Sequence, residues 1–223
     1  LITQQYLSKK WLMQNLLTGK KRLNLDFPDS GIKGLGEVEK SSQSFNPTNQ
    51  GADNGKRVKG VDKDWNYVRI KAVASEISIK NRGDKELVVL SCTKYNGLVP
   101  SLEYFGRKIY ADDLTTYKIV PQNHFAYATN HIEEGSIGYQ SNYNEALISP
   151  MYTVFRTDNS INDQFLFKLL KSFNYIHHYQ KRMEGSIDRR GGLRWDEFSK
   201  IKIPLPSLEE QYAITQILQT SDI

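Results

Sequence analysis

The sequence predicts an α+β fold class: a β-rich domain with a packed helix, and a further helix at each end of the chain. Three patterns predict this class. Short segments in which apolar and polar residues alternate, separated by turn residues, extend from 65 to 156. An apolar stripe of helical period follows at 161–182. Helical patterns without glycine or proline occupy 2–18 and the last residues from 207.

The composition of the 223 residues is that of a soluble globular protein, with 39% hydrophobic and 25% charged residues. No apolar run approaches the length of a transmembrane helix, and the first residues lack the pattern of a secretory signal. Because Cys92 is the only cysteine, the sequence excludes an intramolecular disulfide and a multi-cysteine zinc site. We therefore expect a cytoplasmic protein.

The positive charge is concentrated at the start of the chain. The formal net charge is +5, and residues 1–25 contain no acidic residue. Their basic residues, which account for the whole excess, are Lys9, Lys10, Lys20, Lys21 and Arg22. The rest of the chain is neutral overall, so nucleic-acid binding by the central domain would depend on local patches.

The N-terminal helix is expected over 2–18, with Gly19 as the left-handed residue that ends it. No start signal precedes this helix and no stop signal ends the last one, so we expect a piece of a longer protein. Residues 24–60 are rich in Gly, Asn, Ser, Asp and Lys and are interpreted as a linker or long loop. The predicted division is 1–23, 24–60, 61–206 and 207–223.

Seven short segments of the central region are predicted strands because their residues alternate or form short apolar runs. They are 67–73, 76–80, 87–90, 117–120, 125–127, 137–139 and 151–155. The continuously apolar segment 87–90 predicts a buried strand. Turn residues such as Asn96-Gly97 and Pro121-Gln122-Asn123 lie between the segments, which indicates an antiparallel arrangement.

Two helices complete the prediction. The helix over 161–182 is expected to be capped by Ser160, with Asp163 at the third position. A loop rich in glycine and arginine follows at 185–195, and 201–205 is a short extended piece. The last helix opens with the capping box Ser207-Leu208-Glu209-Glu210.

Patterns for catalysis are missing from the sequence. It contains no G-x-G-x-x-G turn and no Walker loop. The text nearest to an adenine methyltransferase loop, Asn46-Pro47-Thr48-Asn49, lacks the second proline and the aromatic residue. No lysine has an acidic residue two positions before it, as a common nuclease core requires. His131 has no third metal ligand that the sequence identifies, and Cys92 is interpreted as a buried, unreactive thiol.

Polar, aromatic and basic loops remain as candidates for binding DNA. Arginine and lysine hold phosphates or read guanine, asparagine and glutamine read adenine, and glycine lets the backbone approach phosphates. Taken singly, each candidate is more often an ordinary loop residue than a DNA contact. The candidates are Lys94, Tyr95, Asn96, Arg107, Lys108, Asn130, His131, Tyr139, Gln140, Asn142, Arg189, Arg190 and Arg194.

Several stretches of the chain resemble a known family, the specificity subunits of type I restriction–modification systems. The text at 9–23 resembles the end of the family's conserved coiled-coil helix; it reads KKWLMQNLLTGKKRL. The text at 201–218 resembles the start of the next such helix; it reads IKIPLPSLEEQYAITQIL. Two central segments are similar to one subtype of the target recognition domain; they read LSCTKYNGLVPSLEYFGRKIYADDLTTYKIVPQNHFAYA and ALISPMYTVFR. The text at 181–192, KRMEGSIDRRGG, resembles the family's loop before the last helix.

The resemblance implies that the chain is the second of two tandem target recognition domains, flanked by segments of an antiparallel coiled coil. In the family each domain reads one half of a split DNA sequence. The implied partners are double-stranded DNA, methylase (M) and restriction/translocase (R) subunits, and a second copy or the other half of the subunit. The chain would bind no cofactor, whereas S-adenosylmethionine, ATP and Mg²⁺ would belong to the partner subunits. The linker 24–60 departs from the family by its length.

The resemblance also implies roles for the candidate residues. The loops around Lys94, Arg107, Asn130 and Tyr139 would approach base edges, and the arginines of 185–195 would hold phosphates. Packing of the helices, against a partner or against each other, is expected from Trp11, Leu12, Leu16, Leu17, Tyr212, Ile217 and Leu218.

Two alternatives to a DNA-reading module stay open from the sequence alone. One is a protein assembly module that docks methylase subunits without reading DNA, because both terminal helices have apolar faces. The other is a nuclease or modification enzyme with an unrecognised motif. The absence of cofactor and metal patterns argues against the second alternative.

Overall fold

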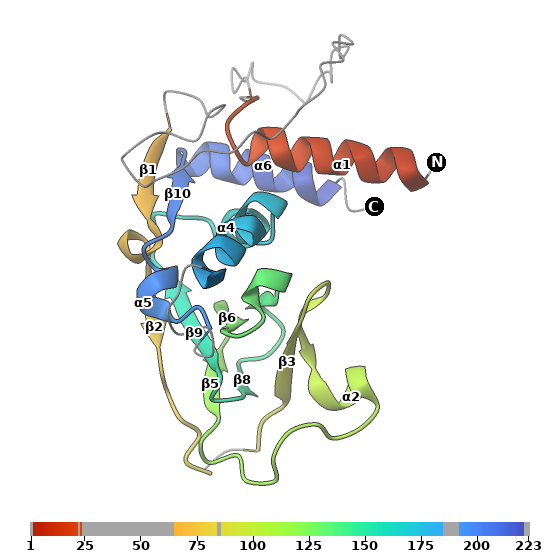
Figure 1. Ribbon diagram of the computed structural model, residues 1–223, viewed down its shortest axis with the longest axis vertical. Coiled ribbons are helices and arrows are strands. Elements are labelled where there is room, and N and C mark those ends of the chain that lie inside the picture. Colours follow the sequence, from red (N-terminus) through yellow and green to blue (C-terminus); the bar gives the residue numbers. More distant parts are fainter. Residues whose placement is uncertain (1, 22, 24–64, 84–85, 185–191, 221–223) are drawn as a thin grey trace.

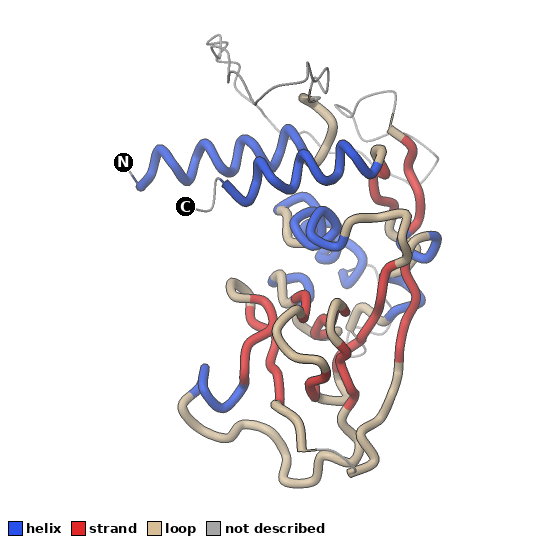
Figure 2. Tube along the Cα trace, turned by 180° about the vertical axis from the view of Figure 1, so that it is seen from behind, coloured by secondary structure: helices blue, strands red, loops and turns tan. Residues whose placement is uncertain are grey.

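The terminal helices lie side by side along one end of the molecule (Figures 1 and 2). The computed structural model describes residues 2–21, 23, 65–83, 86–184 and 192–220. Helix α1 (Ile2–Leu16) and helix α6 (Leu208–Thr220) run in opposite directions. Gly19 has a φ of 68°, and its amide donates to the carbonyl of Leu16, so it ends α1 as predicted. The predicted linker 24–60 lies outside the described residues.

A two-stranded antiparallel sheet connects the domain to α6. It pairs β1 (Asn66–Arg69) with β10 (Lys202–Leu205). The predicted strand 67–73 is wrong in its second half, because a 3-10 turn, η1 (Ile70–Ala72), interrupts it. Ile70 and Lys71 donate their amides to the carbonyls of Ile201 and Ser199, which takes the chain out of the ladder. The turn buries Ile70 in the largest cluster of buried apolar side chains, here called the main core, which includes Phe125, Phe155 and Phe165. The next strand, β2, belongs to a different sheet.

A four-stranded sheet, here called the inner sheet, is antiparallel throughout. Its strands, in spatial order, are β2 (Ala74–Ile77), β9 (Tyr152–Thr157), β6 (His124–Ala128) and β7 (Ile137–Gln140). Alternate side chains of β6 and β9 leave on opposite faces. Phe125 and Phe155 stack with their ring centroids 4.8 Å apart on the face that belongs to the main core.

A second four-stranded sheet, here called the outer sheet, contains one parallel pairing. Its strands, in spatial order, are β4 (Gly97–Pro100), β3 (Val89–Thr93), β8 (Glu145–Ile148) and β5 (Lys118–Pro121). Because β3 and β8 run parallel, the prediction of a purely antiparallel domain is wrong at this point. The chain between them contains β4, β5 and the β6–β7 hairpin. A parallel pair needs such a long crossover, because the chain must return to the same end of β3.

Three helices cover the free face of the inner sheet. They are α3 (Asp163–Leu170), α4 (Phe173–Glu184) and α5 (Trp195–Phe198). Phe165 and Phe198 join Phe125, Tyr127 and Phe155 in the main core. On its other face the inner sheet meets the outer sheet through small aliphatic residues: Ala126, Val154, Val120 and Ile148. The continuous burial of β6 follows, since both of its faces are covered.

The single helix predicted over 161–182 is two helices that meet at Lys171 and Ser172. The Asn162 side chain caps α3 by accepting from the Phe165 amide at 2.9 Å, so the prediction of a Ser160 cap is wrong. The Ser172 amide donates to the Leu169 carbonyl, and the Ser172 carbonyl accepts from the Ile176 amide. The Tyr179 hydroxyl donates to the Leu170 carbonyl at 2.9 Å, which satisfies a group left over at the end of α3.

Four short elements have no sequence prediction. They are β4, β8, α2 (Ser101–Phe105) and α5. The capping box of α6 is confirmed in its serine, since Ser207 Oγ accepts from the Glu210 amide at 3.2 Å. Among the described residues, no helix is both long enough and apolar enough to cross a membrane.

Candidate nucleic-acid interface

Three turns that are distant in the sequence meet at one edge of the domain. They comprise residues 94–96, 129–135 and 192–194, here called the turn cluster. Lys171 Nζ donates to the carbonyls of Lys94 and Gly135, at 2.7 and 2.8 Å, and so joins the first turn to the second. The Leu193 amide donates to the Thr129 carbonyl at 2.9 Å and joins the third turn to the second. The structure thus brings together Lys94, Tyr95, Asn96, Asn130, His131 and Arg194, which are predicted site residues.

The first turn is held open toward solvent by its own hydrogen bonds. Thr93 Oγ1 accepts from the Asn96 amide at 3.0 Å and donates to the Gly97 carbonyl at 3.3 Å. Gly97 takes a φ of 66°, which glycine adopts without strain. The Tyr95 side chain is 80% exposed, and Lys94 Nζ lies 5.4 Å from its ring centroid. The turn therefore presents an aromatic face, a cation and an amide together.

The second and third turns make a close backbone contact. A Cβ on Gly192 would lie 2.4 Å from the Thr129 carbonyl oxygen and 2.4 Å from Asn130 Oδ1. Real Cβ atoms essentially never come this close to other atoms, so only glycine, which has no Cβ, fits at this position. The sequence predicted that glycines of this loop admit phosphates, but Gly192 admits the backbone of the neighbouring turn. Arg194 is exposed just after it, whereas Arg189 and Arg190 lie outside the described residues.

One group of side chains in the described part of the chain could hold a metal ion. The ligand atoms of His131, Glu133 and Glu134 lie within 4.8 Å of one another. His131 Nδ1 and Glu134 Oε1 are 3.4 Å apart, and both side chains are mostly exposed. The sequence identified no third ligand for His131 because the short turn η2 (Ile132–Glu134), which folds the chain back, had no predictive pattern.

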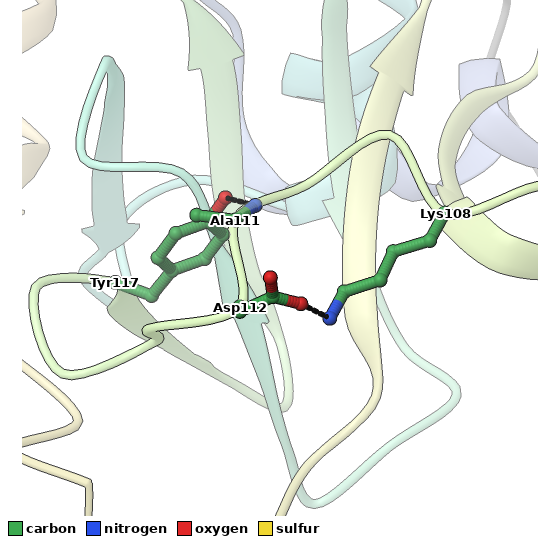
Figure 3. Close-up of polar contacts among 4 residues, drawn as sticks. All are labelled: Lys108, Ala111, Asp112 and Tyr117. Carbon is green, nitrogen blue, oxygen red and sulfur yellow. Dashed lines mark hydrogen bonds and ion pairs between the residues drawn. The ribbon is translucent and has the colours of Figure 1, made fainter.

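Arg107 and Lys108 lie on a loop that a hollow separates from the turn cluster. The hollow has a volume of about 310 Å³, and its lining includes Ile109 and Tyr110 from the loop, Asn130 and His131 from the turn cluster, and Met151. A hydrogen bond joins this loop to Tyr117: the Ala111 amide donates to the Tyr117 hydroxyl at 3.2 Å (Figure 3). Lys108 forms an ion pair with Asp112, and this hydrogen bond raises the pKa of Lys108. A phosphate would have to compete with Asp112 for Lys108.

Two of the predicted residues serve the fold at the opposite end of β7. Gln140 is buried: its amide nitrogen donates to the Tyr143 carbonyl, and its Oε1 accepts from the amides of Asn142 and Tyr143. The Tyr139 hydroxyl donates to Asp163 at 2.9 Å, and desolvation followed by this hydrogen bond raises the pKa of Tyr139. Because their polar atoms are already hydrogen-bonded within the domain, we expect neither side chain to read bases. Asn142 is exposed but lies at the end of β7 away from the turn cluster.

The residues predicted to pack the terminal helices fall into two groups. Leu16, Leu17 and Leu218 are buried in the main core, and Leu12 and Ile217 pack against it. This places them between the helices of the same chain and its domain. Trp11 and Tyr212 are 43% and 56% exposed and face outward. Lys21 Nζ lies 5.4 Å from the centroid of the Trp11 ring.

Two further residues beside the site have different outcomes. Desolvation raises the pKa of the Cys92 thiol to about 12, which supports its interpretation as an unreactive cysteine. Lys171 was not predicted as a site residue, because the sequence placed it in the middle of one continuous helix. The signal that could have found it is the Lys171-Ser172 pair between two apolar stripes, a polar interruption at which α3 ends.

Comparison with solved structures finds the same fold in a longer protein. The match with the HsdS subunit from Thermoanaerobacter tengcongensis covers 99% of this chain and 44% of that subunit, with a TM-score of 0.53 and 13% sequence identity. A structure described as the basis of complex assembly and conformational transition of the type I R-M system matches with a TM-score of 0.48 and 15% identity, over 99% of this chain and 46% of that one. The match with the type I restriction-modification S subunit from M. genitalium covers 72% of this chain and 39% of that subunit, with a TM-score of 0.45 and 14% sequence identity. This chain thus spans less than half of each of these proteins.

Comparison with sequences gives the family directly. No curated protein matches the chain. The family model described as type I restriction modification DNA specificity domain matches residues 62–223, which include both four-stranded sheets, the turn cluster and α6. Because this match covers well over half of the chain, the chain belongs to the type I restriction modification DNA specificity domain family.

Proposed function

We propose that this chain is a non-catalytic, sequence-specific DNA-binding module that reads one half-site for a type I restriction–modification complex. The turn cluster is the observation that carries this proposal. It gathers a lysine, two asparagines and an arginine, Lys94, Asn96, Asn130 and Arg194, with the exposed ring of Tyr95. These are the residue types that bind phosphates and base edges, and three separate segments of a rigid domain supply them.

Different side chains of the turn cluster would contact base edges and phosphates. Asparagine presents a donor and an acceptor that match the adenine edge, and each good bidentate pair supplies about 1–3 kcal/mol of discrimination. Asn96 and Asn130 are the candidates for this role. Arg194 would hold phosphates, which set the orientation of the domain without reading sequence. Arg107 belongs to the loop whose residues Ile109 and Tyr110 line the hollow, and it would extend the contact along the duplex.

Methyl transfer, cleavage and translocation would be carried out by partner subunits. In this proposal methylase subunits bind S-adenosylmethionine and flip the target base, and restriction subunits use ATP and Mg²⁺. The antiparallel α1 and α6 would continue into longer helices that set the distance between two half-sites. Membership of the type I restriction modification DNA specificity domain family supports partners of this kind.

A second candidate function is a protein assembly module that docks methylase subunits without reading DNA. The outward faces of the terminal helices favour it, because Leu7, Trp11, Leu208 and Tyr212 are large apolar side chains that are all more than 40% exposed. The two functions are compatible, since the turn cluster and these helix faces are different surfaces.

Selection from a randomised duplex library tests the proposal. The full chain is incubated with the library at several salt concentrations, with and without a methylase partner, and the bound duplexes are sequenced. A short enriched motif supports a half-site reader. Because one half-site offers few contacts, we expect the chain alone to bind weakly. Methylase binding with no enrichment under any condition would leave only the assembly function.

A further inference from the structure

We propose that Lys171 is a positioning residue that holds two DNA-reading turns, 94–96 and 129–135, at a fixed separation. This inference deepens the proposed function and rests on it. Within the described residues, Lys171 hydrogen-bonds to backbone atoms and to no candidate base-reading side chain. It acts through two backbone carbonyls, those of Lys94 and Gly135, to which its ammonium group donates at 2.7 and 2.8 Å.

The position of Lys171 makes it a bridge between the two sheets. The turn 94–96 joins β3 to β4 in the outer sheet, and the turn 129–135 joins β6 to β7 in the inner sheet. No backbone ladder connects these two sheets in the described part of the chain. Lys171 is the C-cap residue of α3, so the helix layer adds a hydrogen-bonded bridge between the two sheets at these turns.

The two turns are already close, and Lys171 fixes how they meet. A Cβ on Gly135 would lie 3.7 Å from the Lys94 carbonyl oxygen and 3.2 Å from Ile176 Cδ1. Further along the same contact, a Cβ on Gly138 would lie 2.5 Å from the Leu98 amide nitrogen, so β4 and β7 pack backbone to backbone. Small errors in this contact would move the side chains of Asn96 and Asn130 by amounts that matter for bidentate hydrogen bonds.

The charge of Lys171 is used inside the domain. The side chain is half-buried, and desolvation lowers its pKa from the ordinary value. A partly desolvated ammonium group that already donates to two carbonyls makes a strong, charge-assisted bridge. We therefore expect Lys171 to contribute to selectivity and to contribute little to the salt dependence that phosphate contacts produce.

The test compares Lys171→Met with Lys181→Met, which removes an exposed lysine from the adjacent helix α4. Hydrogen exchange measures the protection of amides in 94–97 and 134–137, and thermal unfolding checks that each variant folds. The Lys171→Met variant is expected to lose protection by about tenfold or more in both turns at once, while the Lys181→Met variant is unchanged. This measurement needs no DNA, so it stands even if the proposed function fails.

Selection from the duplex library then gives the functional result. We expect the Lys171→Met variant to select its motif about tenfold less strongly, with an unchanged slope of log K against log salt. Gly135→Ala, which strains a backbone of φ 93° in the same turn, is expected to weaken selection in the same way. A slope lower by about 0.9 would instead make Lys171 a phosphate contact. Unchanged exchange in both turns, or unchanged selection by a variant that has lost protection, would overturn the positioning role.

Discussion

The indole of Trp65 donates a buried hydrogen bond to Glu210, with 3.1 Å between Nε1 and Oε2. These residues are 145 positions apart, at the start of the domain and in the first turn of α6. The Trp65 ring also covers the end of α1, since a Cβ on Gly19 would lie 3.1 Å from it. One tryptophan therefore contacts both terminal helices from the start of the domain.

Glu210→Ala is expected to destabilise the protein by about 1–3 kcal/mol, because it leaves the Trp65 donor buried without this acceptor. Glu209→Ala is the matched control: Glu209 is exposed in the same helical turn, so both changes remove the same favourable interaction with the helix end. Chemical denaturation of both variants measures the difference. Equal free energies of unfolding for the two variants would contradict the proposed contribution of the Trp65–Glu210 contact.

Tyr95→Ala is expected to weaken DNA binding while leaving the midpoint of thermal unfolding unchanged. The side chain is 80% exposed at the tip of the first turn, so its removal uncovers no core. An aromatic face beside a cation contributes to contacts with sugars, bases and phosphates. Tyr95→Phe serves as the control, because it keeps the ring and should keep most of the affinity. Full binding by the Tyr95→Ala variant would remove this ring from the interface.

Gln140→Ala is expected to lower stability by about 1–3 kcal/mol and to leave the selected DNA motif unchanged. The buried amide closes the turn 140–143 through hydrogen bonds at both of its ends, so its loss leaves backbone groups without these partners. Asn142→Ala, two residues later and exposed, is the comparison. Denaturation and library selection are measured on both variants. A changed motif in a stable Gln140→Ala variant would restore Gln140 as a reader of bases.

Arg194→Ala is expected to reduce the slope of log K against log salt by about 0.9 and to weaken binding similarly for all sequences. Arg194 is exposed beside the turn 129–135, to which Leu193 is hydrogen-bonded. Lys202→Ala removes an exposed cation from β10, in the two-stranded sheet, and should leave the slope unchanged. The decisive contrary result is a variant whose preferred motif shifts while its salt slope stays constant.

Arg189→Ala and Arg190→Ala carry the same expectation, which rests on the sequence of the glycine-rich loop alone. Each variant should bind all duplexes more weakly and show a flatter salt dependence, measured by titration at several salt concentrations. A variant that changes only the preferred sequence would make the arginine a base contact.

The local sequence predicted most elements because their signals are local. Gly19 ends α1, Ser207 caps α6, and the short apolar runs at 125–127 and 137–139 mark β6 and β7. The strand 67–73 and the helix 161–182 were predicted too long for a common reason. Each apolar pattern continues through a point where the chain turns, and the partners that stabilise the turn, Ile201 and Gly135 among them, are distant in sequence.

Composition, periodicity and short motifs were enough to predict the fold class, the family resemblance and the residue types available for DNA. Which of the candidates share a surface became visible in the folded domain. It gathered Lys94, Asn130 and Arg194 and moved Gln140 into the interior. Exposure and proximity depend on packing between segments that are far apart along the chain, and a polar loop residue has the same local pattern whether it binds a partner or closes a turn.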